Sequence, residues 1–304
     1  MPVPHSSGNF GDVLDKRVTK ILYDELKQTE DKLPTFFSME TSKDSFERWS
    51  EVGAIGDFTE FSGTVAYQSQ AQGYETTATH KEWVNGFQVT RDLFDDDRHG
   101  IWERRPVALA NAYQRTRQKH GARIFNNAFS VDTFFYNNSE GVALCSDAHT
   151  TTSGASTASG FDNLVTTALT ATAVSALRTQ MRKFRGDQAE IFSCMPSMLL
   201  VPVDLQDKAL EITKSMGDPS SANNAVNPQQ GRYKLVDWEY VTDVNNWFLI
   251  DERYMKMWLI WFQRIALEFG QAEELDTLVA KWRAYCRYSN MWTNWRWIAG
   301  ASVS

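Results

Sequence analysis

Residues 91–130, RDLFDDDRHGIWERRPVALANAYQRTRQKHGARIFNNAFS, separate two parts of the chain that differ in character. Acidic side chains gather at the start of this stretch, at Asp92 and 95–97, and basic ones toward its end, as a helix dipole favours. Several side chains recur mostly at intervals of three or four residues and share one helical face: Tyr113, Thr116, His120, Ile124 and Phe125. Because proline disrupts a helix interior but suits a first turn, we expect a break near Gly100 and a restart close to Pro106.

Length and composition predict a soluble protein with no exported or membrane-bound form. A chain of 304 residues can form two compact domains, or one domain with extended arms. A net charge of −7 argues against a nucleic-acid-binding surface. Cys145, Cys194 and Cys286 are too scattered for a disulfide framework or a CxxC metal site, so a reducing cytoplasm is the simplest interpretation. The N-terminus lacks a signal-peptide pattern, and the densest apolar run, Met255 to Phe262, is too short to span a bilayer.

Residues 1–44 are typical of an arm. One amphipathic helix has an apolar face formed by Leu14, Val18, Ile21, Leu22 and Leu26. We expect Pro34 to end this helix and a short extended piece to follow. Such an arm must pack on the rest of the chain or on a neighbour.

Residues 45–90 predict a long hairpin. Phe61, Gly63, Val65 and Tyr67 alternate with small polar side chains, as in a strand with one covered face. Residues 70–73 form the expected turn, and Tyr74 to Thr79 the return strand. A hairpin alone is only marginally stable in water, so we expect it to lie on another surface.

The second half predicts a mixed α/β unit. A helix from Val174 to Phe184 is expected to end at a left-handed cap at Gly186, and Asp204 is expected to cap a second helix. The expected strands are residues 190–194, 198–201, 234–242, 247–251 and 255–262. Alternation over residues 282–288, a turn at Ser289 and Asn290, and a return over 295–299 predict a closing hairpin. The eleven Trp, ten Tyr and eighteen Phe side chains can serve a core or a subunit interface, and both interpretations stay open.

No stretch has the pattern of an active site. Cys145 to His149 crowd a nucleophile, an acid and an imidazole together, but neighbours in an extended chain point apart, so an ordinary loop is favoured. The acids at 95–97 fit helix-start electrostatics better than a cation site. No zinc spacing and no phosphate-binding glycine loop occurs, so we predict no catalytic, cofactor-binding or metal-binding residues. The basic patch Arg178, Arg182, Lys183 and Arg185 is either a solvated helix face or an interface to an acidic neighbour.

The order of these elements resembles the tailed-phage major capsid protein with the Hong Kong 97-type fold, and more narrowly the Mu-like major head subunit group. Residues 162–215, DNLVTTALTATAVSALRTQMRKFRGDQAEIFSCMPSMLLVPVDLQDKALEITKS, carry the resemblance through a helix, a glycine, two strands and a second helix. Residues 141–149 and the terminal Arg296 to Gly300 fit the same pattern. The resemblance implies an α+β fold with an N-terminal arm, an extended β-hairpin loop, a long spine helix in a peripheral domain and a mixed α/β axial domain.

The resemblance also implies a role for each segment. The arm would be residues 1–44, the extended loop 45–90, the peripheral domain 91–160, the axial domain 161–270 and the C-terminal β return 271–304. No built-in scaffolding domain and no lysine–asparagine pair for cross-linking is visible.

The implied function is a non-catalytic major capsid protein that self-assembles through hexamers and pentamers into the icosahedral shell around phage double-stranded DNA. It would be assembled in the host cytoplasm and located in the virion, with a scaffolding protein, a portal and a decoration protein as partners, and with DNA nearby but not specifically bound. The candidate intersubunit contacts are Phe61, Val65, Tyr67, Tyr74, Arg178, Arg182, Lys183 and Arg185. Two alternatives are an encapsulin-like nanocompartment shell protein and a cytosolic α/β enzyme with a site around His149.

Overall fold

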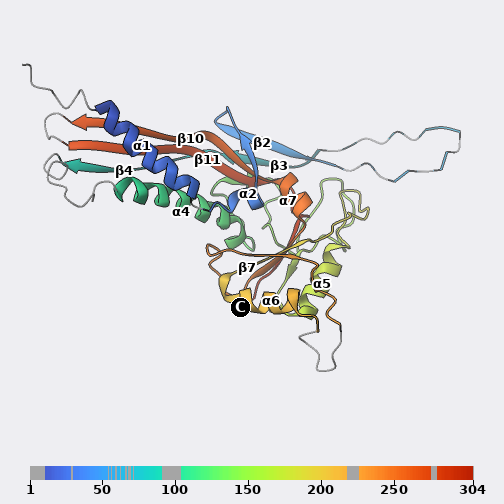
Figure 1. Cartoon of the computed structure of the whole chain (residues 1–304). Helices are drawn as coiled ribbons and strands as arrows, with labels where there is room; N and C mark the ends of the chain where they lie inside the picture. Colours follow the sequence, from blue (N-terminus) through green and yellow to red (C-terminus); the bar gives the residue numbers. More distant parts are fainter. Residues whose placement is uncertain are drawn as a thin grey trace, which may run out of the picture.

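The computed structural model describes residues 11–303, except for 29, 54, 56, 59, 62, 66, 68, 69, 71, 91–103, 218–225 and 275–278. Within this part, the backbone forms three sheets, with helices against two of them (Figure 1). A long sheet covered by helices extends to one side, a second unit of helices and strands lies below, and a hairpin projects to the other side.

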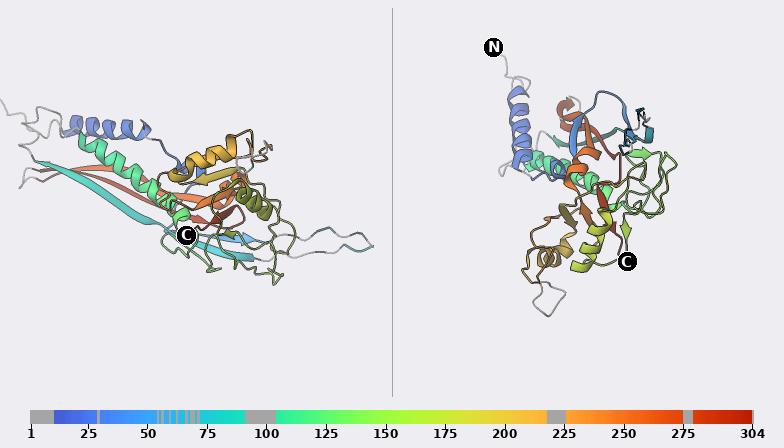
Figure 2. Two further views of the ribbon diagram at one scale, coloured as in Figure 1. Left: turned by 90° about the horizontal axis from the view of Figure 1, so that it is seen from below. Right: turned by 90° about the vertical axis from the view of Figure 1, so that its right-hand side faces the viewer.

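The long sheet has the strand order β1-β10-β11-β4. Its strands are β1 (Ser38–Thr41), β4 (Lys81–Thr90), β10 (Leu259–Glu274) and β11 (Val279–Trp292). Helices α1 (Gly11–Gln28) and α4 (Arg104–Asn126) lie on the same face of this sheet (Figure 2). Side chains alternate along a strand, so Trp282 and Ala284 of β11 lie on the same face. Trp282 packs with Val18 of α1, and Ala284 packs with Leu22 of α1 and Leu109 of α4.

The five-stranded sheet has the order β6-β12-β9-β7-β8 and contacts α5 and α6. Its elements are β6 (Leu164–Val165), α5 (Ala171–Met181), β7 (Met198–Val201), η2 (Val203–Leu205), α6 (Gln206–Lys214), β8 (Lys234–Asp237), β9 (Trp247–Ile250) and β12 (Ile298–Ala301). Strands β7, β9 and β12 are buried along their whole length, which explains their continuous apolar sequences.

The third sheet carries the projecting hairpin. Strands β2 (Phe46–Val52) and β3 (Gln72–Thr79) pair antiparallel, and β5 (Tyr136–Asn138) pairs with the body end of β3. The described residues between 53 and 70 lie beyond these strands, at the end of the hairpin farthest from the body (Figure 1).

Aromatic side chains fill the region where the three sheets meet. Five tryptophans are almost fully buried there: Trp238, Trp247, Trp261, Trp292 and Trp297. The short helix α2 (Leu33–Phe36) inserts Phe36, which stacks on Trp238 at 4.7 Å between ring centroids. Gly121 of α4 leaves room for α2 to pack against α4, because a Cβ at residue 121 would overlap Leu33 Cδ2. The core interpretation of the aromatic residues is therefore confirmed for these side chains.

The long helix begins at Arg104, so Pro106 lies in its first turn, as predicted. The expected break near Gly100 lies outside the described residues. At the other proline the prediction was wrong, because α1 already ends at Gln28. Pro34 lies in the first turn of α2, where its missing N–H is not needed. The extended piece expected after it is partly present as β1, which pairs parallel with β10.

The expected hairpin strand through Phe61 to Tyr67 was also wrong, because no described residue from 53 to 71 has strand structure. The partner of β3 is β2, and β4 leaves the hairpin to pair with β11. Alternation marks an extended segment but does not identify its partner.

The closing hairpin was wrong for the same reason. Strand β11 continues through Ser289 and Asn290 to Trp292, between β10 and β4, and β12 belongs to the other sheet.

Two further strand predictions in the second half were wrong. Residues 255–258 form part of α7 (Glu252–Trp258), since the Asp251 side chain accepts a hydrogen bond from Arg253 N and starts a helix there. Residues 190–194 contribute only one isolated bridge, from Ile191 to Arg185.

Neither predicted cap forms. Gly186 is not among the residues with positive φ, and α5 has already ended at Met181. Asp204 lies inside the short helix η2, and α6 begins without a side-chain cap.

Candidate functional site

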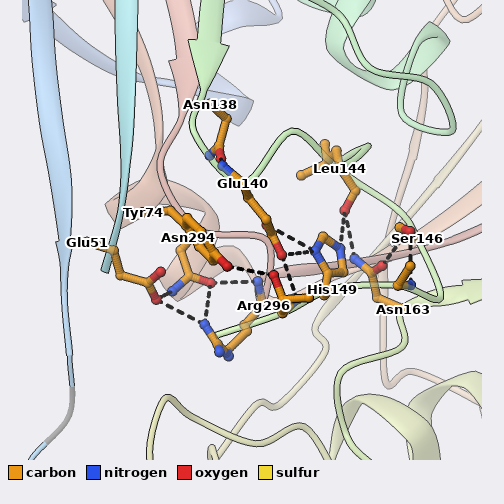
Figure 3. A network of polar contacts seen from close by, with 12 residues as sticks. Glu51, Tyr74, Asn138, Glu140, Leu144, Ser146, His149, Asn163, Asn294 and Arg296 are labelled. Atoms are coloured by element: carbon orange, nitrogen blue, oxygen red, sulfur yellow. Dashed lines mark hydrogen bonds and ion pairs between the residues drawn. The ribbon is translucent and has the colours of Figure 1, made fainter. Parts of the chain in front are cut away.

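The root of the hairpin is fixed to the body by buried polar contacts (Figure 3). Arg296 Nη1 donates to Glu51 Oε1 at 2.9 Å, and Asn294 Nδ2 donates to the same carboxylate. On β3, Thr76 Oγ1 accepts from Asn138 Nδ2 at 2.9 Å. Strand β2 is thus held by contacts with side chains more than 200 residues later in the chain. Strand β3 is held by pairing with β2 and β5.

Glu51 is an unusual carboxylate. Burial raises its pKa to about 7, against the opposing effect of the Arg296 cation, and nearby Asp187 and Glu140 raise it further. Its side chain is 16% exposed. The desolvation of the carboxylate therefore outweighs a well-formed ion pair.

The crowded segment from Cys145 to His149 is a tightly bonded loop. His149 is 2% exposed, stacks on Trp295 at 4.2 Å, and its Nδ1 lies 3.1 Å from Glu140 Oε1. Burial raises the pKa of Cys145 far above the range of a reactive thiol. These side chains therefore fix the loop and are not arranged to attack a substrate.

Asn163 joins this loop to the C-terminal strand. Its Nδ2 donates to the carbonyl oxygens of Leu144 and Ile298, and its Oδ1 accepts from Ser146 N (Figure 3). The side chain is fully buried, so this amide replaces backbone hydrogen bonds that the irregular loop lacks.

The predicted contact residues of the hairpin fall into two groups. Phe61, Val65 and Tyr67 are exposed by 71, 57 and 93%, and nothing else in the described part of the chain covers them. Tyr74 is half-buried, and its hydroxyl lies 2.6 Å from Thr150 Oγ1, so it ties β3 to the body. Phe58, fully exposed in the same segment, was missed because it falls outside the alternation that singled out the others.

The basic patch is also divided. Arg182 and Lys183 are exposed just after α5. Arg178 and Arg185 are half-buried, and Arg185 Nη1 donates to the carbonyl oxygen of Ala189 at 2.6 Å. Of these four side chains, Arg182 and Lys183 are therefore the two that are exposed enough to contact a neighbour.

The ligand-binding chemistry of the described residues is limited. Their His, Cys, Asp and Glu side chains form no group of three or more that could hold a metal ion.

His80 lies between β3 and β4 and is buried. Its two ring nitrogens lie 2.8 Å from Ser289 Oγ and 2.9 Å from Ser42 Oγ, and burial lowers its pKa. No helix in the described ranges is long and apolar enough to cross a membrane.

A projecting hairpin, a long helix laid on a sheet and a separate mixed α/β unit define a Hong Kong 97-type shell subunit. A family model described as phage capsid protein matches residues 73–301, which is most of the chain. The chain belongs to the phage capsid protein family. It is a structural protein of the virion that associates with further copies of itself in the capsid shell.

Solved structures have the same fold at low sequence identity. The capsid of cyanophage P-SCSP1u is 11% identical over 90% of this chain and 88% of that chain, with a TM-score of 0.58. The capsid of a native GTA particle is 14% identical over 90% of both chains, and that of bacteriophage JBD30 is 14% identical over 80 and 97%; both have TM-scores of 0.56. No curated protein sequence matches. The nanocompartment alternative is not favoured, because the family is one of phage capsids.

Proposed function

We propose that this chain is the repeating subunit of an icosahedral phage head around double-stranded DNA, and that the projecting hairpin overlaps a neighbouring subunit. The observation that carries the proposal is the contrast between the two ends of the hairpin. Its root is held by a buried ion pair and by hydrogen bonds, whereas its far end exposes Phe58, Phe61 and Tyr67. Several exposed aromatic side chains in one short segment are typical of an interaction surface.

The segment roles follow from this arrangement. Residues 46–79 supply the extended loop, and α4 on the long sheet supplies the spine of the peripheral domain. The five-stranded sheet with α5 and α6 supplies the axial domain around five-fold and six-fold centres. Strands β4, β10 and β11 pair in one sheet and belong to the peripheral domain. The extended loop therefore ends before Lys81 instead of at residue 90, and the axial domain ends before Leu259 instead of at residue 270.

The further contacts are proposed on charge and exposure. Arg182 and Lys183 would meet an acidic surface of a neighbour, while Val65 would add apolar area to the hairpin contact. Each contact can be weak, because a shell makes many of them at once.

The remaining partners rest on the family resemblance. Assembly in the host cytoplasm would use a separate scaffolding protein and a portal, with a decoration protein added to the shell. DNA would be enclosed without specific binding, in keeping with the acidic chain. Membership of the Mu-like major head subunit group stays a prediction.

The hairpin proposal is tested by replacing residues 53–71 with a short Gly-Ser turn. The paired residues of β2 and β3 remain, so we expect a folded subunit with an unchanged Tm that no longer forms shells in electron micrographs. The triple variant Phe58→Ser, Phe61→Ser and Tyr67→Ser should have the same effect. Substitution of the exposed Val131 to Ser, on the body, is the matched control. Normal shells from the shortened chain would refute the proposal.

A further inference from the structure

A groove of about 360 Å³ lies between the root of the hairpin and helix α7. Its apolar walls come from the hairpin root, from α7 and from the segment that follows α5: Trp49, Val52, Phe192, Met257 and Trp258. Val52 is 72% exposed and Met257 is 63% exposed, so this apolar surface is open to solvent. The volume is at the lower end of the roughly 300–1,000 Å³ range of small-molecule sites, enough for one long side chain.

The floor of the groove is charged, and its charges do not balance. Three carboxylates line it, from Glu51, Asp187 and Glu190, against one cation, Arg296. Arg296 is already committed to Glu51, and its Nε donates to the carbonyl oxygen of Arg185 at 2.6 Å. Burial raises the pKa of Glu51, and the neighbouring Asp187 carboxylate of the groove raises it further.

Asp187 is the carboxylate that lacks compensation. The residue is 5% exposed, and its Oδ1 accepts from Thr151 Oγ1. Its Oδ2 is buried and accepts no hydrogen bond within the described part of the chain. An unpaired buried carboxylate oxygen is unfavourable, so a group that donates to it is expected at this place.

We propose that this groove binds the side chain of an arginine or lysine from a second copy of the chain, with its charged end at Asp187 and its stem between Trp49 and Trp258. The inference rests on the proposed function, which brings copies of the chain together. The apolar walls suit the methylene stem, and indole rings attract a cation. A metal ion is not favoured, because the described carboxylates do not form a ligand set.

The hairpin tip is not the expected occupant. Residues 52–73 contain Asp57 and Glu60 but no lysine or arginine, so the acidic floor repels that segment. The groove therefore receives a different part of the neighbour from the one that the hairpin supplies. Each subunit would then offer two distinct contacts, one at the far end of its hairpin and one in the groove at the root.

The first test uses shell assembly. Asp187→Asn keeps the size of the side chain and the Oδ1 acceptor while removing the charge; Glu190→Gln removes a second floor charge at a less buried position. Asp204→Asn removes an exposed carboxylate of η2, outside the groove, and is the matched control. We expect both groove variants to keep the wild-type Tm and to need about tenfold more protein to form shells. Unchanged assembly of both variants, beside a wild-type chain that assembles, would overturn the inference and leave the proposed function standing.

The second test uses a small probe on the unassembled full chain. Nα-acetyl-arginine methylamide should quench tryptophan fluorescence saturably and inhibit shell assembly, and Asp187→Asn should weaken both effects about tenfold. The neutral citrulline analogue should do neither. If spermidine binds in an Asp187-dependent manner while Asp187→Asn assembles normally, the site takes a free polyamine and the second-copy proposal is refuted. A wild-type chain that never forms shells refutes both the proposed function and this occupant.

Discussion

Replacing Glu51 by glutamine should change the pH dependence of subunit stability in a defined direction. In the folded chain the carboxyl has a pKa of about 7, against an ordinary value of 4.5, chiefly because burial disfavours its charged form. Between these two pH values the folded chain holds a proton that the unfolded chain has released. Stability contributed by this group is therefore present below about pH 4.5 and is lost as the pH rises to about 7.

The size of the effect follows from the gap between the two pKa values. At about 1.4 kcal/mol for each pH unit, the gap corresponds to about 3 kcal/mol of unfolding free energy. The glutamine side chain of the variant cannot titrate but keeps an oxygen that accepts from Arg296. We therefore expect the free energy of unfolding of Glu51→Gln, measured relative to the wild type, to rise by up to about 3 kcal/mol from pH 4.5 to pH 8.

The assay is urea unfolding of the unassembled subunit, followed by tryptophan fluorescence at several pH values. Taking the difference between variant and wild type at each pH removes the contribution of other titrating groups. Glu60→Gln, on the exposed far part of the hairpin, should show no such trend. A constant difference across the range would refute the reasoning. A difference that falls as the pH rises would show that the Arg296 ion pair outweighs desolvation.

Two further substitutions test the packing of the long helix. Gly121→Ala should lower the free energy of unfolding by about 1–3 kcal/mol, because the new Cβ overlaps Leu33 and closely approaches Trp238. This cost exceeds the gain of about 1 kcal/mol that alanine normally brings to a helix interior. A higher Tm of the variant in thermal unfolding would contradict this. Asp132→Asn should cost about 2 kcal/mol, since it breaks a bidentate pair with Arg123 at 2.8 and 2.9 Å around a 6% exposed carboxylate. Equal urea midpoints for wild type and Asp132→Asn would show that the pair contributes no net stability.

Local patterns in the sequence predicted the elements better than their partners. The periodicity after Pro106 marks α4, because one helix contains all the information about its own buried face. The alternation from Trp282 to Tyr288 correctly indicates a strand, but β11 lies between β10 and β4, and β4 is almost 200 residues earlier in the chain. Sheet order depends on such distant pairings, which periodicity does not encode.

The same limit applies to the groove and the hairpin root. Glu51 and Arg296 are 245 residues apart, and each alone is an ordinary charged residue in a polar segment. Asp187 sits in the short sequence Gly186-Asp187-Gln188, which is typical of a surface turn, yet it is buried. Only the fold brings these carboxylates together, so no spacing in the sequence could have indicated an acidic groove. Alternation with small polar neighbours singled out Phe61 and Tyr67 in the hairpin, but it missed Phe58, which falls outside that pattern.

The two ends of the hairpin differ in what stabilises them. A long two-stranded hairpin is marginal in water, so its direction must be fixed by the body from which it leaves. The buried contacts of Arg296, Asn294 and Asn138 provide that fixation without using the far end. The far end is then free to expose apolar surface, which is tolerable only if another molecule covers it. The buried contacts that fix the hairpin lie at its root, so substitutions of the exposed side chains at its far end should impair shell assembly without impairing the fold.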